Sequence, residues 1–183
     1  TIARLGKRRG IAVARRAAAF ADGRTESIGE SWSRALMGTW SDFRLPRLQH
    51  EFRTPDGRFV ARTDFDWDGV MVGEFDGRVK YGGGATDAVL AERRRESRLH
   101  ELGVHVVRWT WGDLQQPREL HRALRQGLDR VGGPVLLGTV EDEALRAELG
   151  QGGEQLVGHC RRVARDDRAT GDRGREGDDG AGA

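Results

Sequence analysis

Cysteine, lysine and long apolar runs are all scarce in this sequence of 183 residues. The one cysteine, Cys160, excludes an internal disulfide and a zinc site made of several thiolates. The five histidines show no i, i+4 pair and no cluster, so they do not indicate zinc either. No apolar run approaches the roughly 18 residues that are needed to cross a bilayer. We therefore expect a cytoplasmic protein that has no membrane partner.

The shortage of lysine is extreme, since Lys7 and Lys80 are the only lysines among 31 basic residues. A GC-rich genome, which encodes arginine in place of lysine, is the simplest explanation of the bias. A lysine that persists inside the folded part, as Lys80 does, is then a candidate for a role that needs a compact ammonium group. The net charge of only +2 gives no independent indication of nucleic-acid binding.

Apolar periodicity and turn signals predict one α/β domain over residues 25–131, in the order α-β-β-β-α-β-α. The expected helices cover residues 10–21, 27–39, 86–102 and 117–131, and the expected strands cover 48–53, 58–67, 70–76 and 104–111. Residues 1–24 are interpreted as an N-terminal helical remnant and residues 132–163 as a weakly structured extension. The tail 164–183 contains no apolar residue larger than alanine, so we expect it to be disordered.

Three acidic residues fall on two neighbouring predicted strands. Glu74 and Asp76 are two residues apart, so they share one face of their strand at a separation of roughly 7 Å. For Asp64 to share that face, it must lie opposite an even-numbered residue of the next strand. A two-residue turn at 68–69 would place Asp64 opposite Gly73 instead. The acidic cluster therefore requires an odd loop, for example three residues with Gly69 in the left-handed region, or a bulge.

Four segments together resemble a known family: R-T-D-F-D-W, V-G-E-F-D-G-R-V-K-Y-G, A-E-R-R-R-E-S-R-L and V-V-R-W-T-W-G-D-L. In this order and spacing they look like bacterial Vsr-like domains of the PD-(D/E)XK, restriction-endonuclease-like fold. Such domains occur C-terminally in AbiEi-type, antitoxin-like actinobacterial proteins, often behind a winged helix. This chain has no such helix and starts at Thr1 rather than at methionine, which is consistent with an upstream portion.

The resemblance implies a mixed sheet flanked by helices, and metal-dependent hydrolysis of phosphodiester bonds in DNA. It places Asp64 and Glu74 as ligands of Mg²⁺ or Mn²⁺, with Glu30 as a supporting acid. Oxygen ligands of this kind suit a hard cation, which lowers the pKa of a bound water. The wider fold often has lysine two residues after the second ligand, where this chain has Asp76. Lys80 is expected to supply the missing positive charge.

Arg95 on the following helix is an alternative source of that charge, and Arg94 is a weaker one. Most of the other singled-out residues also have an ordinary structural interpretation. Glu30 has capping-box spacing from Ser27, so capping and catalysis are both open for it. Asp76 suits a tight turn as well as a ligand role. Asp66 and Asp68 are favoured as turn residues, and Trp109 and Trp111 are favoured as core residues. Residues 82–84 are favoured as a linker. Residues 93–95 and Arg98 are favoured as a solvated helix face.

Three hypotheses about function follow from the sequence. The first is a Mg²⁺-dependent endonuclease acting on DNA, which the retained Asp64, Glu74 and Asp76 favour. The second is a non-cleaving module of an antitoxin-like transcriptional regulator, which binds DNA or a protein partner. The missing lysine after Glu74 favours this second hypothesis. The third is a truncated gene product that has no present function.

Overall fold

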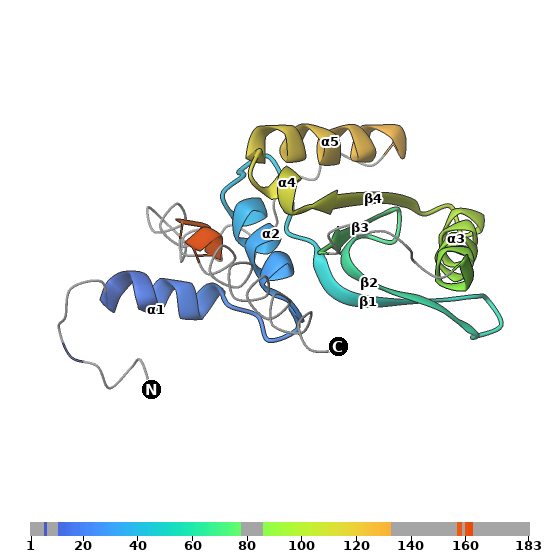
Figure 1. Cartoon of the computed structure of the whole chain (residues 1–183), viewed down its shortest axis with the longest axis horizontal. Helices are drawn as coiled ribbons and strands as arrows, with labels where there is room; N and C mark the ends of the chain where they lie inside the picture. Colours follow the sequence, from blue (N-terminus) through green and yellow to red (C-terminus); the bar gives the residue numbers. More distant parts are fainter. Residues whose placement is uncertain (1–5, 7–10, 78–85, 133–156, 159, 163–183) are drawn as a thin grey trace, which may run out of the picture.

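The computed structural model describes residues 6, 11–77, 86–132, 157–158 and 160–162, and it has the predicted order of elements (Figure 1). Every predicted helix and strand is present, with boundaries within one residue of those expected. The elements are α1 (Ile11–Phe20), α2 (Ile28–Gly38), β1 (Arg47–Arg53), β2 (Phe59–Trp67), β3 (Met71–Asp76), α3 (Thr86–Glu101), β4 (His105–Thr110), α4 (Trp111–Leu114) and α5 (Pro117–Arg130).

The one-turn helix α4 was not predicted from the sequence. It forms because Thr110 ends β4 in an extended conformation and then caps the turn that follows. The Thr110 Oγ1 accepts a hydrogen bond from the backbone of Gly112, and the Asp113 carboxylate accepts one from the backbone of Thr110. This reciprocal pair satisfies donors that a helix start leaves open. The segment W-G-D-L therefore turns away from the sheet directly after β4.

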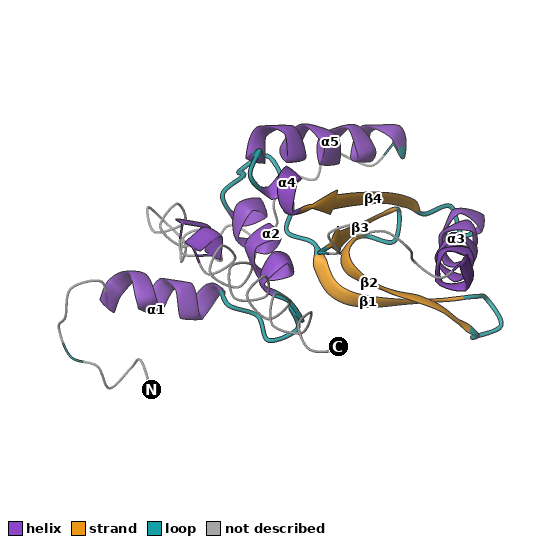
Figure 2. Ribbon diagram, viewed as in Figure 1, coloured by secondary structure: helices purple, strands orange, loops and turns teal. Residues whose placement is uncertain are grey.

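The four strands form one mixed sheet in the spatial order β1-β2-β3-β4 (Figure 2). The pairs β1–β2 and β2–β3 are antiparallel, whereas β4 runs parallel to β3. A parallel neighbour requires a long crossover connection, and here the segment between β3 and β4 contains α3. The molecule is thus an α/β protein whose sheet is flanked by helices, as expected.

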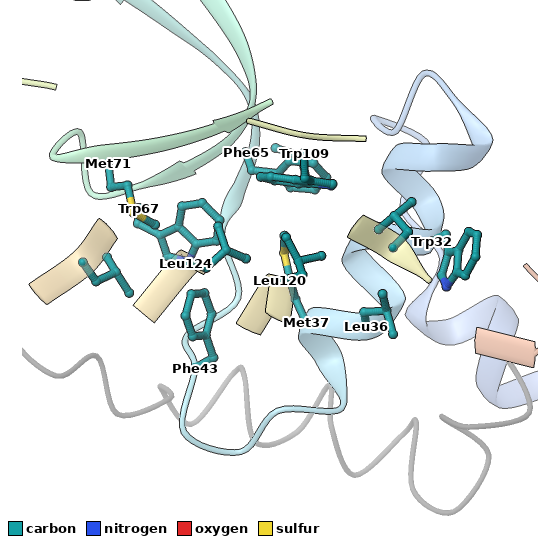
Figure 3. Packing of buried hydrophobic residues seen from close by; sticks show 13 residues of the cluster. Trp32, Leu36, Met37, Phe43, Phe65, Trp67, Met71, Trp109, Leu120 and Leu124 are labelled. Carbon is teal, nitrogen blue, oxygen red and sulfur yellow. The ribbon is translucent and has the colours of Figure 1, made fainter. Parts of the chain in front are cut away.

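One face of the sheet packs against α2, α4 and α5 and forms the larger core. Trp67, Met71 and Trp109 project from three strands into this core, where the side chains of the helices meet them (Figure 3). The helix side chains in the same cluster are Trp32, Leu36, Met37, Leu114, Leu120, Leu124 and Leu128. Burial of these large aromatic and aliphatic side chains removes apolar area from water and stabilises the fold.

The opposite face of the sheet packs against α3, which carries the smaller core. Leu99 of α3 lies fully buried against Val60, Val72 and Val104. Residues two apart on a strand share a face, so the side chains of Glu74 and Val72 lie on the same side of β3. The face that α3 covers is therefore also the face that carries the acidic residues.

The β2–β3 connection has the odd length that the acidic cluster requires. Phe65 pairs with Gly73 and Trp67 pairs with Met71, which leaves residues 68–70 as a three-residue loop. Asp68 and Gly69 both adopt positive φ values, 52° and 74°. The Asp66 carboxylate accepts a hydrogen bond from the Gly69 backbone at 2.9 Å and stabilises the turn. The expected three-residue loop with left-handed Gly69 is confirmed, and Asp64 and Glu74 line the same cleft.

Several predictions fall wholly or largely on residues outside the described part of the chain. Lys80, the loop 82–84, most of the extension 132–163 and the tail 164–183 are in this group. Two segments beyond residues 25–131 contact the domain, because Phe20 and Val157 pack against Ala35 of α2. Within the described residues, no helix is both long enough and apolar enough to span a bilayer.

Candidate functional site

Asp64 and Glu74 lie side by side on β2 and β3. The Asp64 Oδ2 accepts a hydrogen bond from the Phe75 backbone N–H at 2.9 Å, so the carboxylate lies against the neighbouring strand. Both acids line a cleft of about 350 Å³. The residues that line this cleft are Asp64, Glu74, Phe75, Asp76, Gly77, Glu92, Arg95 and Arg108. The predicted pair of ligands thus shares one face and opens to a common space.

Burial raises the pKa of both carboxyl groups. For Asp64, loss of solvent raises the pKa most, the hydrogen bond from Phe75 opposes this increase, and the negative charge of Glu30 adds to it. For Glu74, burial again raises the pKa most, while the positive charges of Arg95 and Arg108 oppose the increase. Each anion is therefore held in surroundings that disfavour its charge, and a cation in the cleft would stabilise it.

Arg95 reaches the cleft from α3 and pairs directly with Glu74. Its Nη1 donates to the Glu74 Oε1 at 2.6 Å, and its Nη2 contacts the same oxygen. The Arg95 Nε also lies 3.5 Å from the Glu92 carboxylate. Leu99, four residues later on the same face of α3, is buried in the core and fixes this orientation. The structure thus places Arg95 at the acidic centre, as predicted.

Arg108 on β4 is a second cation at the site, and the sequence interpretation missed it. The parallel register pairs Arg108 with Glu74, and its Nη2 lies 3.4 Å from the Glu74 Oε2. Arg108 also pairs with Glu92 and with Glu96, which continues the ion-pair network onto α3. A charged residue inside the otherwise apolar run V-V-R-W was the available signal. Its significance depended on the parallel register, which local sequence does not specify.

Glu30 takes part in both of the interactions that the sequence left open. Its backbone donates to the Ser27 Oγ at 3.1 Å, and its carboxylate accepts from the Ser27 hydroxyl at 2.7 Å and from the Glu26 backbone at 2.9 Å. Glu30 is only 7% exposed and its charge raises the pKa of Asp64. It therefore caps α2 and also lies close to the acidic pair.

Gln49 on β1 joins this cluster and was also not predicted. Its Nε2 donates to the Glu30 Oε2 at 3.1 Å, and its side-chain amide stabilises the charged form of Asp64, which lowers the pKa of that carboxyl. Nothing in the local pattern of β1 marks Gln49, because its relevance arises from the pairing of β1 with β2.

The remaining predicted residues differ in their relation to the cleft. Asp76 lines it. Arg94 is exposed and lines a separate groove of about 320 Å³ on α3, together with Arg93 and Arg98. Lys80 lies outside the described residues. Of the two arginines of α3 that were candidates for the positive charge at the site, Arg95 therefore reaches Glu74 and Arg94 does not.

Arg95 is an exception among the residues with a favoured structural interpretation, because its side chain pairs with Glu74 and does not lie on a solvated face. The acids of the turn and the two tryptophans are closer to expectation. Asp66 is buried, holds the β2–β3 turn and pairs with Arg47. Asp68 sits in the turn and pairs with Arg44 at 2.7 Å. Trp109 is a core residue whose indole N–H donates to the Ser33 Oγ at 2.7 Å. Trp111 is half-buried and packs against Trp32 and Phe75.

A divalent cation would find two protein carboxylates at this site. Among the described residues, no group of three or more His, Cys, Asp or Glu side chains is arranged to hold a metal ion. Mg²⁺ is commonly bound through one or two carboxylates, with water and substrate phosphates completing its coordination. The pair Asp64 and Glu74 fits this sparse mode. Glu74 can take part only if it exchanges part of its pairing with Arg95 for the cation.

Comparisons with known proteins leave the family open. No family model matches the chain, and no solved structure matches it. The chain is 32% identical over 125 residues to the uncharacterized proteins MT2308 and Rv2248 of Mycobacterium tuberculosis, from strains CDC 1551 / Oshkosh and ATCC 25618 / H37Rv. The matched region covers 68% of this chain and 45% of each relative. The chain therefore spans less than half the length of the curated relatives that it matches.

Proposed function

We propose that this chain carries a Mg²⁺- or Mn²⁺-dependent endonuclease domain with a restriction-endonuclease-like core, which hydrolyses phosphodiester bonds in DNA in the cytoplasm. The observation that carries the proposal is that Asp64 of β2 and Glu74 of β3 line one cleft, which Arg95 and Arg108 also line. Two carboxylates beside two guanidinium groups provide a cation site next to an anion site. Metal-dependent cleavage of a phosphodiester uses both.

Each group of the cleft has a distinct role in this proposal. Asp64 and Glu74 hold the cation, which supplies a bound water of lowered pKa when it is present. Arg95 and Arg108 donate hydrogen bonds to the phosphate oxygens, because a planar guanidinium matches the geometry of a phosphate. Glu30 of α2 and Gln49 of β1 lie beside Asp64 and hold it in position. Asp76 also lines the cleft and assists the two cation ligands.

Arg95 would have a second partner during the reaction. In the structure it pairs with Glu74, and Arg108 lies 3.4 Å from the same carboxylate. If a cation and a phosphate were bound together, Glu74 would hold the cation and Arg95 would donate to the phosphate. Each of the two groups would then keep a partner of opposite charge, so neither would be left as an unpaired buried charge.

Nicking of supercoiled plasmid DNA in Mg²⁺ or Mn²⁺ tests the proposal. The parent should convert the plasmid to open-circular and linear forms, and EDTA should stop the reaction. Asp64→Asn and Glu74→Gln should each lower the rate at least about 100-fold, since each removes a cation ligand. Asp68→Asn, in the turn outside the cleft, is the matched control and should cleave like the parent. Equal cleavage by all four proteins would rule out this site.

The second candidate is a non-cleaving module of an antitoxin-like transcriptional regulator, which binds DNA or a protein partner. Two observations favour it: Asp76 occupies the position of the expected lysine, and Glu74 is already neutralised by two arginines. A protein of this kind would bind DNA in EDTA and would not nick it. Binding without cleavage in Mg²⁺ and in Mn²⁺ would support the regulator over the nuclease.

A further inference from the structure

Gln49 adopts an unfavourable backbone conformation in the middle of a strand. Its φ is 53°, in the left-handed region that side chains other than glycine rarely occupy. Asp68 is the one other non-glycine residue with positive φ in the described part of the chain, and the β2–β3 turn explains it. No turn is present at Gln49, because β1 continues from Arg47 to Arg53. Strain of this kind persists only where its surroundings impose it.

The strained residue lies directly across from a predicted metal ligand. Leu48 pairs with Phe65 and His50 pairs with Thr63, so Gln49 falls opposite Asp64 between these two pairs. Asp64 in turn lines the same cleft as Glu74 of the next strand. The backbone irregularity of β1 therefore occurs beside the residue that leads into the acidic cleft.

The side chain of Gln49 lies between two acids of different elements. Its amide donates to the Glu30 Oε2 at 3.1 Å, and the register of β1 against β2 places Gln49 opposite Asp64. A primary amide offers two N–H donors and carries no charge. It can hold two carboxylates together without neutralising them, whereas a lysine or arginine would compete with a bound cation.

We propose that Gln49 is a positioning residue, which holds the Asp64 carboxylate in the orientation that a divalent cation requires and which keeps its strained backbone for that purpose. The inference rests on the proposed function, because it assumes that Asp64 is a cation ligand. It adds a residue of β1 that acts through Asp64 and Glu30 without touching the substrate.

Two substitutions separate the backbone strain from the amide. Gln49→Gly removes the side chain and relieves the strain, and Gln49→Asn keeps an amide and tolerates positive φ. Asp68→Gly relieves the other strained position outside the cleft and is the matched control. For all four proteins, urea unfolding measures stability and calorimetry measures Mn²⁺ affinity.

The proposal predicts that Gln49→Gly unfolds at a urea concentration equal to or above that of the parent but binds Mn²⁺ about tenfold more weakly. Gln49→Asn should recover part of the affinity, and Asp68→Gly should bind Mn²⁺ like the parent. Parental affinity in a folded Gln49→Gly would overturn the positioning role and leave the cation site intact. Absence of Mn²⁺ binding by the parent would overturn the proposed function and the role of Gln49 with it.

Discussion

Asp64 and Glu74 are carboxyl groups whose pKa values are raised by burial, and this fixes how they affect stability. The folded protein retains these two protons at pH values where the unfolded chain has lost them. Their contribution to stability is therefore fully present below the ordinary carboxyl pKa of about 4. It is lost as the pH rises through the raised pKa of the folded state. Near neutral pH the fold therefore contains two carboxylates whose burial disfavours their charge. Functional sites often reduce the stability of a fold in this way.

Neutralising Asp64 should stabilise the apo protein. Asp64→Asn can still accept the hydrogen bond from Phe75, but it carries no buried charge, so we expect a gain of about 1 kcal/mol at pH 7. The gain should shrink toward pH 4, where the parental carboxyl is protonated. Urea unfolding of both proteins from pH 4 to pH 8 measures the difference. Asp129→Asn, on the exposed side of α5, is the control, and a less stable Asp64→Asn at pH 7 would contradict the account.

Removing Arg95 should have the opposite effect, because it takes a partner from Glu74. The Glu74 side chain is 11% exposed and that of Arg95 is 27% exposed, so the pair lies between a surface and a buried ion pair. We expect Arg95→Met to destabilise the fold by about 2 kcal/mol. Adding Glu74→Met should recover part of this loss, with a coupling of about 1 kcal/mol or more in a double-mutant cycle. The exposed Arg94→Met is the control, and additive effects in the cycle would contradict the pairing.

At the scale of elements, the sequence predicted what local patterns encode. Alternation and turn residues located all four strands, and the requirement that Asp64 share a face with Glu74 led to the odd loop at residues 68–70. Gln49 and Arg108 were missed for a common reason. Their place in the cluster depends on how β1 pairs with β2 and how β4 lies parallel to β3, and these long-range registers leave no local signal.

Helix α2 and strand β3 meet so closely that glycine is required between them. A Cβ at Gly29 would lie 1.9 Å from the Phe75 ring, and Phe75 directly follows Glu74. Gly29→Ala should displace the ring, destabilise the fold by about 2 kcal/mol and weaken Mn²⁺ binding, because the Phe75 backbone also holds Asp64. Urea unfolding and calorimetry measure the two effects. Gly112→Ala, whose Cβ would meet its nearest atom at 3.5 Å, should change both much less.

For the whole molecule, the distribution of charge matters more than its sum. The net charge is only +2, yet α3 directs Arg95 into the cleft and exposes Arg93, Arg94 and Arg98 along a groove. Within the described residues Arg93, Arg94 and Arg98 form no ion pair, whereas Arg95 pairs with two glutamates. A polyanion that enters the cleft would find additional cations on the same helix.

The salt dependence of DNA binding tests whether this exposed face contributes. If Arg93, Arg94 and Arg98 each neutralise one phosphate, replacing all three with serine should lower the slope of log affinity against log salt by about 2.7. Duplex binding measured from 50 to 300 mM salt gives this slope. Replacing Arg118, Arg122 and Arg130 of α5 removes the same charge elsewhere and is the control. Equal reductions in both triple variants would show a general charge effect.

Calorimetric titration of the purified protein with Mn²⁺ tests the central claim most directly, because it asks whether Asp64 and Glu74 form one cation site. The account predicts saturable binding of one ion by the parent and loss of that binding in both Asp64→Ala and Glu74→Ala. Each variant is first shown to be folded by urea unfolding. A folded parent that binds no Mn²⁺, or variants that bind it as the parent does, would contradict the account and leave the regulatory module as the better explanation.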